Sequence, residues 1–324
     1  MSARPVVVVT RRLTPAVEDA VSGEFDARLN RDDRPLSTEE LKEAFRSADA
    51  VLPTVTDKIT ADVLSVEPLR ARMIANFGVG FNNIDVQAAK ARGVSVSNTP
   101  DVLTDATADL AITLMLMVAR RTGEGERHVR AGQWTGWRPT HMLGRMVSGR
   151  TLGLIGMGRI AKAVARRAHS GFGMRVVFTD PYPPTPAEAA ALGAEQRATV
   201  EDVLAEADIV SLHCPATPET RHLMNAERLG RMKPSAYLIN TARGDVVDEA
   251  ALIQALGSGR IAGAGLDVFE REPQVSPELL RMENVVLLPH LGSATEETRT
   301  AMGMRALENL RLFFAGAQLR DRVV

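Results

Sequence analysis

Between Leu152 and Asp180 the chain reads LGLIGMGRIAKAVARRAHSGFGMRVVFTD, a short apolar run followed by a glycine turn, a helix, a second apolar run and one carboxylate. This order predicts a strand, helix and strand joined by a turn at Gly156 and Gly158 that lets the backbone approach a pyrophosphate. The phosphates would lie on the N–H groups and the positive dipole end of the helix. The pattern therefore predicts a dinucleotide-binding unit.

The third small residue of this fingerprint is Ala161, a variant that still allows the helix to pack closely on the strand. Asp180 is expected to accept hydrogen bonds from the adenosine ribose hydroxyls, and a solvated carboxylate before Pro181 is the alternative. An acid at this place repels a 2′-phosphate and so favours NAD over NADP. The turn residues expected to contact the cofactor are Gly156, Met157, Gly158, Arg159 and Ile160.

Length and composition fit a protein with a localised small-molecule site. A chain of 324 residues exceeds the size at which one core keeps growing, so two domains are expected. Forty acids against thirty-nine bases leave no global field that would attract nucleic acid or an anionic membrane. The single cysteine, Cys214, excludes an internal disulfide framework and any multi-cysteine metal site, so no metal is expected.

The apolar runs are too short for membrane insertion or export. The four valines at Val6–Val9 are too few for the apolar region of a signal peptide. The most apolar stretch, residues 110–119, is half of the roughly 20 residues that a bilayer span needs. We therefore expect a soluble, cytoplasmic protein.

Strands and helices are expected to alternate, which predicts parallel sheets with both faces covered. In the first hundred residues the expected strands are 6–9, 50–52, 73–76 and 94–97, with helices at 15–22, 38–48 and 86–91. After the glycine turn the expected strands are 152–155, 175–179, 209–213, 236–240, 262–266 and 285–288. Six such strands would complete one doubly wound sheet.

Two helices flank this second series of strands. Asp105 is a candidate N-cap for a helix from residue 106 to about 120, which is apolar nearly all round and so is expected to be buried between domains or subunits. Ser293–Gly316 begins with SATE, a capping-box signature, and continues as a long amphipathic helix. Because that helix has no strand partner of its own, we expect it to pack on the first domain.

An arginine and a histidine each follow an apolar strand. Arg243, in INTARGDVVDEAAL, would lie at a strand's carboxyl end, where ligands bind in open α/β sheets. Its planar fork of donors suits a carboxylate or a polarised carbonyl, and a surface ion pair with Asp245 or Asp248 is the alternative. His290, in VVLLPHLGSAT, lies at another such end, and imidazole suits proton exchange near neutrality.

A carboxylate partner would orient and charge the imidazole of His290. The stretch GAGLDVFEREP offers Glu270 and Glu272 in a loop, because Pro273 disfavours a helix at the residue before it. Spacing alone does not choose between these two acids. His213 ends a strand and is a candidate for lining the nucleotide cleft, whereas core or capping roles are expected for His128, His141, His169 and His222.

Seven stretches together resemble the D-isomer-specific 2-hydroxyacid dehydrogenases. They are NFGVGFNNID, NTPDVLTDATADLA, LIGMGRIAKAVA, SLHCPATPETRHLMN, INTARGDVVDEAAL, AGLDVFEREP and LPHLGSAT. The resemblance runs in order from Met73 to Thr295. GQWTGWRPTHMLG, with Trp134 and Trp137, narrows it towards the glyoxylate and hydroxypyruvate reductase branch.

The resemblance implies a fold and a catalytic triad. A Rossmann coenzyme domain of residues 100–289 would be inserted in a discontinuous, flavodoxin-like substrate domain of residues 1–99 and 290–324, each with a doubly wound parallel α/β sheet. Arg243 would bind the substrate carboxylate and carbonyl, His290 would donate the proton, and Glu272 would orient and charge His290.

The resemblance also implies the contacts of substrate and cofactor. The N–H groups of Val79 and Gly80 would hold the substrate carboxylate, while Thr107 would lie on the nicotinamide side and Asp267 would hold the carboxamide. Pro215 and Thr220 would line the adenine and phosphate region. The further cofactor contacts expected are Thr241, Ala242, His290 and Gly292.

The implied activity is reduction of a small 2-oxo acid, with glyoxylate or hydroxypyruvate favoured, to the D-2-hydroxy acid. NADH is favoured by Asp180, but many relatives in this branch use NADPH through a basic residue nearby; Arg175 lies too early to serve. A homodimer is expected, in which Trp137 either reaches the partner's substrate pocket or only anchors the interface.

Other functions on the same scaffold stay open at this point. They are a D-lactate-like or 3-phosphoglycerate specificity, or an NAD-sensing corepressor that acts through partner binding. Glu272 argues against a formate dehydrogenase, in which an amide replaces the acid partner of the histidine.

Overall fold

The computed structural model of the chain describes residues 4–324 and divides into two compact units. The first comprises the described residues up to Leu103 together with Ser293–Val324, and the second is Thr104–Gly292. The expected boundaries, after residues 99 and 289, differ from these breaks by a few residues, and the roles of the two domains stay predictions. Within residues 4–324 no helix is long and apolar enough to cross a membrane.

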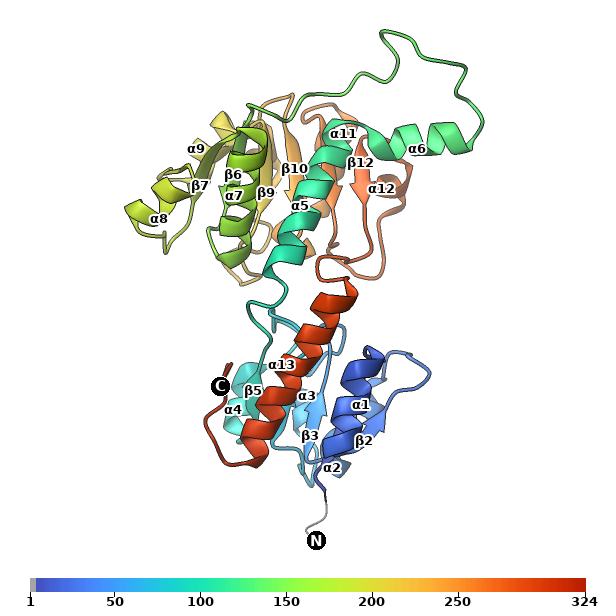
Figure 1. The fold of residues 1–324 in the computed structure, drawn as a ribbon, viewed down its shortest axis with the longest axis vertical. Helices are drawn as coiled ribbons and strands as arrows, with labels where there is room; N and C mark the ends of the chain where they lie inside the picture. The colour runs from blue at the N-terminus through green and yellow to red at the C-terminus, as the bar shows by residue number, and fades with distance from the viewer. Residues whose placement is uncertain (1–3) are drawn as a thin grey trace. The chain divides into compact units, whose positions relative to one another are not determined.

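The first unit is built on a five-stranded parallel sheet (Figure 1). Its strands lie in the order β2 (Asp26–Leu29), β1 (Val6–Val9), β3 (Ala50–Leu52), β4 (Met73–Ala75) and β5 (Ser95–Ser97). This order, 2-1-3-4-5, is that of flavodoxin. The two short central strands β3 and β4 are fully buried, as strands covered on both faces must be.

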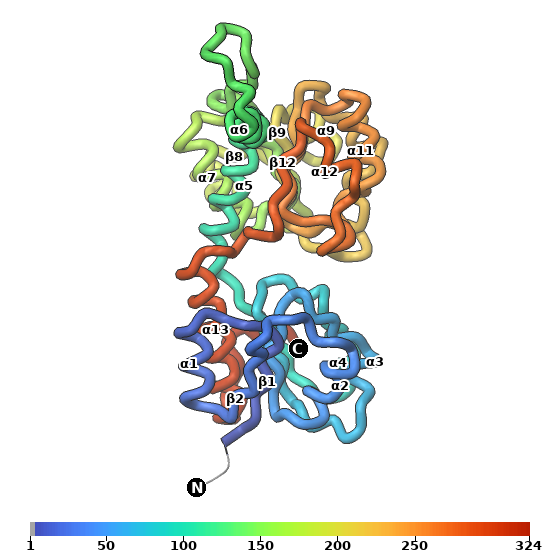
Figure 2. The backbone as a smooth tube through the Cα atoms, turned by 90° about the vertical axis from the view of Figure 1, so that its right-hand side faces the viewer, coloured from blue at the N-terminus to red at the C-terminus, as the bar shows by residue number. Residues whose placement is uncertain are grey.

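Helices cover both faces of this first sheet, as Figure 2 shows. One layer holds α2 (Thr38–Ser47), α3 (Ala61–Leu64) and α4 (Val86–Ala91), and the other holds α1 (Pro15–Glu24) and α13 (Glu296–Phe314). Helix α13 contacts β4 and α1, which confirms that the last helix packs on the first domain. Gly303 allows this contact, because a Cβ there would overlap the side chain of Val17.

The second unit is built on a seven-stranded parallel sheet. Its order is β12 (Val285–Leu287), β11 (Gly263–Leu266), β10 (Tyr237–Asn240), β9 (Ile209–Leu212), β6 (Thr151–Ile155), β7 (Arg175–Thr179) and β8 (Ala194–Gln196). Counted from β6, this is the Rossmann order 3-2-1-4-5-6 with one further strand beside the sixth. The predicted doubly wound sheet is therefore present, with seven strands where the sequence indicated six.

Two helical layers sandwich the second sheet. Leu152 and Leu154 of β6 lie in a core with α5 (Thr104–Ala119) and α7 (Arg159–Phe172), whereas Ile155 lies in a core with the other layer. That layer holds α9 (Val200–Glu206), α10 (Ala226–Arg231) and α11 (Glu249–Gly257). The remaining helices are α6 (Thr122–Arg130), α8 (Pro186–Ala191), α12 (Pro277–Arg281) and a 3-10 turn at Gly244–Val246.

Several local expectations were wrong. Helix α5 begins at Thr104, so Asp105 lies in its first turn and is not its N-cap. The N-cap of α13 is Thr295, whose hydroxyl accepts the N–H of Thr298 at 3.1 Å, and Ser293 forms no capping box with Glu296. The apolar helix α5 packs within the second unit against α7, β10 and β11, and its expected burial between domains or subunits stays a prediction.

Candidate active site

The glycine turn lies between β6 and α7 and has the geometry that a pyrophosphate site needs. Gly156 has a φ of 91°, and a Cβ there would lie 2.9 Å from the backbone N of Cys214, so only glycine fits. Gly158 is the N-cap of α7 and makes no side-chain cap. A Cβ on Gly158 would meet nothing within 4 Å, so open space adjoins the uncapped N–H groups of a long helix.

Asp180 follows the last residue of β7 and contacts the same turn. Its Oδ2 accepts the N–H of Met157 at 2.6 Å, and its Oδ1 accepts the N–H of Tyr182 at 2.6 Å. A carboxylate offers about four lone-pair sites, so both oxygens can still accept from ribose hydroxyls. The residues at the ends of β6 and β7 therefore fit the adenosine half of a dinucleotide.

Other residues expected at the cofactor follow β9 and β10. The hydroxyl of Thr220 donates to the Pro215 carbonyl at 2.6 Å, which closes a turn after β9. Thr241 lies just after β10, and its buried Oγ1 has no hydrogen-bond partner within residues 4–324. A buried hydroxyl without a partner is costly, and a bound ligand would satisfy it. Ala242 is held by its N–H, which donates to Asn240 Oδ1 at 3.0 Å.

His213, also after β9, is uncharged near neutrality. Desolvation lowers its pKa to about 4, and its Nε2 lies 2.9 Å from Ser211 Oγ. It therefore stands at the expected strand end as a neutral, hydrogen-bonded imidazole rather than a proton donor.

Three adjacent parallel strands, β10, β11 and β12, are followed by Arg243, Glu272 and His290 respectively. All three residues therefore lie at the carboxyl ends of the strands. His290 Nδ1 lies 2.9 Å from Glu272 Oε2. The other carboxylate oxygen of Glu272 accepts the N–H of Phe269 at 3.0 Å, which fixes the acid in its own loop. Glu272, rather than Glu270, is thus the acid in contact with the histidine.

Burial and opposite charge set the ionisation of this cluster. Desolvation lowers the pKa of Arg243, and the charges of Glu272 and Asp245 oppose that shift. Burial alone would raise the pKa of Glu272, but the hydrogen bond and charge of His290, the Phe269 N–H and Arg243 outweigh it and lower the pKa. Glu272 is therefore a carboxylate at neutral pH beside a guanidinium and an imidazole.

The backbone at His290 is held in an uncommon conformation by Asp267. His290 has a φ of 56°, in the left-handed region that non-glycine residues seldom adopt. The Asp267 carbonyl accepts the His290 N–H at 2.9 Å, and its carboxylate accepts those of Leu291 at 2.6 Å and Gly292 at 2.8 Å. Conformations of this kind persist where the surroundings over-determine them.

Asp267 is 1% exposed, and burial raises its pKa despite these backbone hydrogen bonds. Its carboxylate therefore has a clear structural role in the His290 loop, and its contact with a nicotinamide carboxamide stays a prediction. Thr107 joins the same loop to α5, because its hydroxyl donates to the Gly292 carbonyl at 3.0 Å.

A second histidine–carboxylate pair lies beside this cluster and was not predicted. His222 Nε2 lies 2.9 Å from Glu270 Oε1, and the His222 N–H donates to the Asp245 carbonyl at 2.8 Å. The loop of Glu270 also passes directly over Gly244, where a Cβ would overlap the backbone of Phe269. The sequence indicated Glu270 only as an alternative partner of His290, and no pattern in it connected Glu270 with His222.

The other residues predicted at the substrate lie on other parts of the chain. Val79 and Gly80 belong to the first unit, in the loop after β4. Trp137 is 81% exposed and lies on the segment after α6, which has no helix or strand between residues 131 and 146 (Figure 1). Their roles at the substrate stay predictions.

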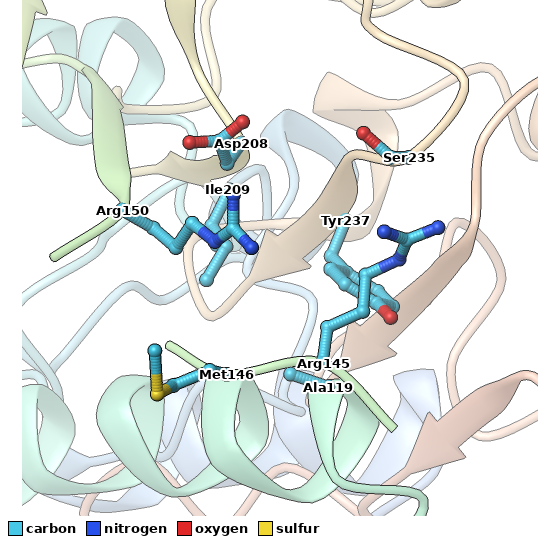
Figure 3. Close-up of a pocket in the computed structure, with 8 residues that line it drawn as sticks. All are labelled: Ala119, Arg145, Met146, Arg150, Asp208, Ile209, Ser235 and Tyr237. Carbon is cyan, nitrogen blue, oxygen red and sulfur yellow. The ribbon is translucent and has the colours of Figure 1, made fainter. Parts of the chain in front are cut away.

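A small pocket in the second unit lies at the amino-terminal ends of the strands (Figure 3). Ile209 and Tyr237, the first residues of β9 and β10, line it together with Arg145 and Arg150. It is therefore separate from the cluster at the carboxyl ends of the strands.

Comparison with known proteins places the chain in a family. A family model described as D-isomer specific 2-hydroxyacid dehydrogenase, NAD binding domain, matches residues 112–292. The chain is 47% identical over 316 residues to a glyoxylate reductase of Korarchaeum cryptofilum, covering 97% of this chain and 94% of that protein.

Solved structures agree with this comparison. A protein of Thermus thermophilus superposes with a TM-score of 0.91 at 43% identity, covering 98% of this chain and all of that one. An NADPH-dependent glyoxylate/hydroxypyruvate reductase of Sinorhizobium meliloti, solved in complex with NADP and malonate, gives 0.88 at 36% identity, covering 99% and 97%. The chain therefore belongs to the D-isomer-specific 2-hydroxyacid dehydrogenases.

Proposed function

We propose that this enzyme reduces a small 2-oxo acid with a nicotinamide cofactor, either glyoxylate to glycolate or hydroxypyruvate to D-glycerate. The observation that carries the proposal is the 2.9 Å contact between His290 and Glu272 at the same sheet edge as Arg243. The glycine turn after β6 of the same sheet leads into α7 without a side-chain cap and has the geometry that a dinucleotide needs. The relatives named as glyoxylate reductases support the choice of acid.

The residues would divide the chemistry as follows. A bound nicotinamide supplies the hydride. The guanidinium of Arg243 binds the substrate carboxylate and the carbonyl oxygen, on which negative charge grows during reduction. His290 Nε2 donates the proton to that oxygen, while Glu272 holds Nδ1 and stabilises the charged imidazole. The backbone N–H groups of Val79 and Gly80 would hold the other end of the acid.

We propose that NADH is preferred over NADPH. Asp180 would accept hydrogen bonds from ribose hydroxyls and repel a 2′-phosphate. The Sinorhizobium meliloti relative is NADPH-dependent, so membership of this family does not decide the cofactor. The contact of Asp180 with the glycine turn supports a ribose-side role for this carboxylate.

We also propose a homodimer in a reducing compartment. Large exposed apolar residues gather on α6 and the segment after it, namely Val129, Trp134, Trp137, Leu143 and Met146. Apolar groupings of this kind mark interaction sites in proteins that are otherwise polar at the surface. The lone cysteine, Cys214, suits the cytoplasm.

A panel of 2-oxo acids assayed with NADH and with NADPH tests the proposal. Glyoxylate, hydroxypyruvate, pyruvate and 3-phosphohydroxypyruvate cover the alternative specificities. Chiral analysis of the glycerate formed from hydroxypyruvate reports the D configuration, because the glycolate formed from glyoxylate is achiral. We expect turnover of glyoxylate or hydroxypyruvate to exceed that of the other two. Binding of NADH without turnover of any acid would instead support an NAD-sensing corepressor.

A further inference from the structure

The loop of residues 78–80 has all three of its carbonyl oxygens held by asparagine side chains. Asn76 Nδ2 donates to the carbonyl of Gly78 at 3.3 Å and to that of Gly80 at 2.9 Å. Asn98 Nδ2 donates to the carbonyl of Val79 at 2.8 Å. One face of this short loop is therefore fixed by two side chains, from the ends of β4 and β5.

Asn76 is itself held in one orientation. It is fully buried, and its Oδ1 lies 3.4 Å from Asn83 Nδ2, which also donates to the carbonyls of Thr54 and Asp57 at 3.1 Å each. The Asn76 amide faces two carbonyl oxygens, which only its NH2 group can satisfy, so its nitrogen points to the loop. The carboxamide thus acts as a fixed double donor.

This arrangement determines where the N–H groups of the loop point. In a trans peptide the C=O and the N–H lie on opposite sides of the bond. Since the carbonyls of Gly78 and Val79 face the asparagines, the N–H groups of Val79 and Gly80 face away from them. Neither N–H donates to another group in the described part of the chain. Two successive backbone N–H groups with no internal acceptor are available to bind an anion.

We infer that Asn76 and Asn98 are positioning residues that aim the N–H groups of Val79 and Gly80 at the carboxylate of the 2-oxo acid. The inference rests on the proposed function, which it deepens by naming the side chains that build the substrate-binding loop. Neither asparagine touches the substrate. Asn98 holds the Val79 carbonyl, and Asn76 holds the Gly78 carbonyl together with the N–H of Thr99, which donates to it at 3.0 Å. Without the asparagine donors the peptides of this loop could rotate and turn their N–H groups away from the substrate.

Replacing each asparagine by aspartate tests this inference, because the shape is kept while the donor is lost. Asn76→Asp and Asn98→Asp are compared with Asn82→Asp, which adds the same charge at an exposed residue close after the loop. The readouts are KM and kcat for glyoxylate, inhibition by oxamate as an unreactive analogue, the Kd of NADH and the melting temperature. Asn98 is only half-buried, so its variant carries the test if Asn76→Asp does not fold.

We expect KM and the oxamate inhibition constant to rise by about tenfold or more in both loop variants. The reason is that a misdirected N–H of Val79 or Gly80 would lose its hydrogen bond to the charged carboxylate of the acid. The kcat should fall less, and the Kd of NADH should stay within about twofold because the glycine turn belongs to the other unit. Asn82→Asp should change KM only slightly.

Three results would overturn the inference. Unchanged KM and oxamate inhibition in both variants would show that the asparagines do not position the loop. An equal effect of Asn82→Asp would show that added charge alone is responsible, and a parallel loss of NADH binding would show a general structural role. An unmodified protein that neither reduces 2-oxo acids nor binds oxamate would contradict the proposed function itself, a result distinct from all three.

Discussion

At the residue scale, the chemistry depends on which acid partners His290. Strand ends indicated Arg243 and His290 from the sequence, because each follows an apolar run and the carboxyl ends of parallel strands share an edge. The choice between Glu270 and Glu272 could not come from spacing, since both lie in one loop. Only the path of that loop over Gly244 places Glu272 at His290 and Glu270 at His222.

These two acids make a matched pair of variants. Glu272→Gln should lower kcat/KM by on the order of a hundredfold or more, because His290 loses the carboxylate that stabilises its charged form. Glu270→Gln should cost much less, because Glu270 contacts His222 instead. Steady-state kinetics with glyoxylate measures both, and equal losses would argue against separate roles.

The same pair gives a pH dependence with a defined sign. The folded-state pKa of Glu272 lies below its ordinary value of 4.5, so its stabilising interactions are present above that value and lost as pH falls through the lower folded pKa. The difference in unfolding free energy between the unmodified protein and Glu272→Gln should therefore be larger at pH about 7 than at pH about 3. Urea unfolding at both pH values measures it, and a difference that grows in acid would contradict this assignment.

The proposed preference for NADH over NADPH depends on Asp180. The unmodified protein should show a higher kcat/KM with NADH than with NADPH, and Asp180→Ala should narrow that ratio because a charge that repels the 2′-phosphate is gone. Asp202→Ala, on α9 of the same unit, serves as the control and should leave the ratio unchanged. Equal use of the two cofactors by the unmodified protein would refute the preference.

At the scale of elements, the sequence indicated the buried strands and the edge strands β5 and β12, but missed the edge strands β2 and β8. Central strands such as β9 and β10 are buried throughout and mostly apolar, because both of their faces are covered. The missed strands β2 and β8 lie at sheet edges and read DARL and AEQ, with several exposed positions. Their pairing depends on a neighbour distant in sequence, which local pattern does not report.

The backbone of Phe269 passes so close to Gly244 that a side chain at this position should reduce both stability and activity. Gly244→Ala would push a Cβ into the backbone of Phe269 and displace the loop that carries Glu272. Overpacking of this kind costs about 1–3 kcal/mol, so both the melting temperature and kcat/KM should fall. Gly230→Ala, where a Cβ meets nothing within 4 Å, should preserve both quantities. A fully active Gly244→Ala enzyme would show that the loop can shift without consequence.

At the scale of the whole molecule, the sequence predicted two parallel sheets and the return of the last helix to the first unit. The return could be expected because α13 follows the final strand with no partner of its own. The role of the apolar residues after α6 could not be predicted from the sequence, because an exposed apolar side chain does not indicate which partner it contacts.

The proposed homodimer through α6 and residues 131–146 can be tested by measuring the mass in solution. Light scattering should give twice the chain mass, and the double variant Trp134→Ser, Met146→Ser should shift the mass towards one chain. Leu280→Ser removes an apolar residue of similar exposure elsewhere and should leave the mass unchanged. Trp137→Ala then distinguishes its two roles: a raised KM for the acid in an intact dimer indicates contact with the partner's substrate, and an unchanged KM indicates an interface anchor. A single-chain mass for the unmodified protein would exclude the dimer.

In the proposed mechanism Arg243 and His290 act on the acid, whereas the glycine turn binds the cofactor. The most direct measurement compares kcat/KM for glyoxylate with the Kd of NADH in Arg243→Ala and His290→Ala, with the exposed Arg231→Ala as control. We expect kcat/KM to fall by on the order of a hundredfold or more in the first two variants, and the Kd of NADH to stay nearly unchanged. Loss of NADH binding equal to the loss of rate, or full activity of either variant, would contradict it.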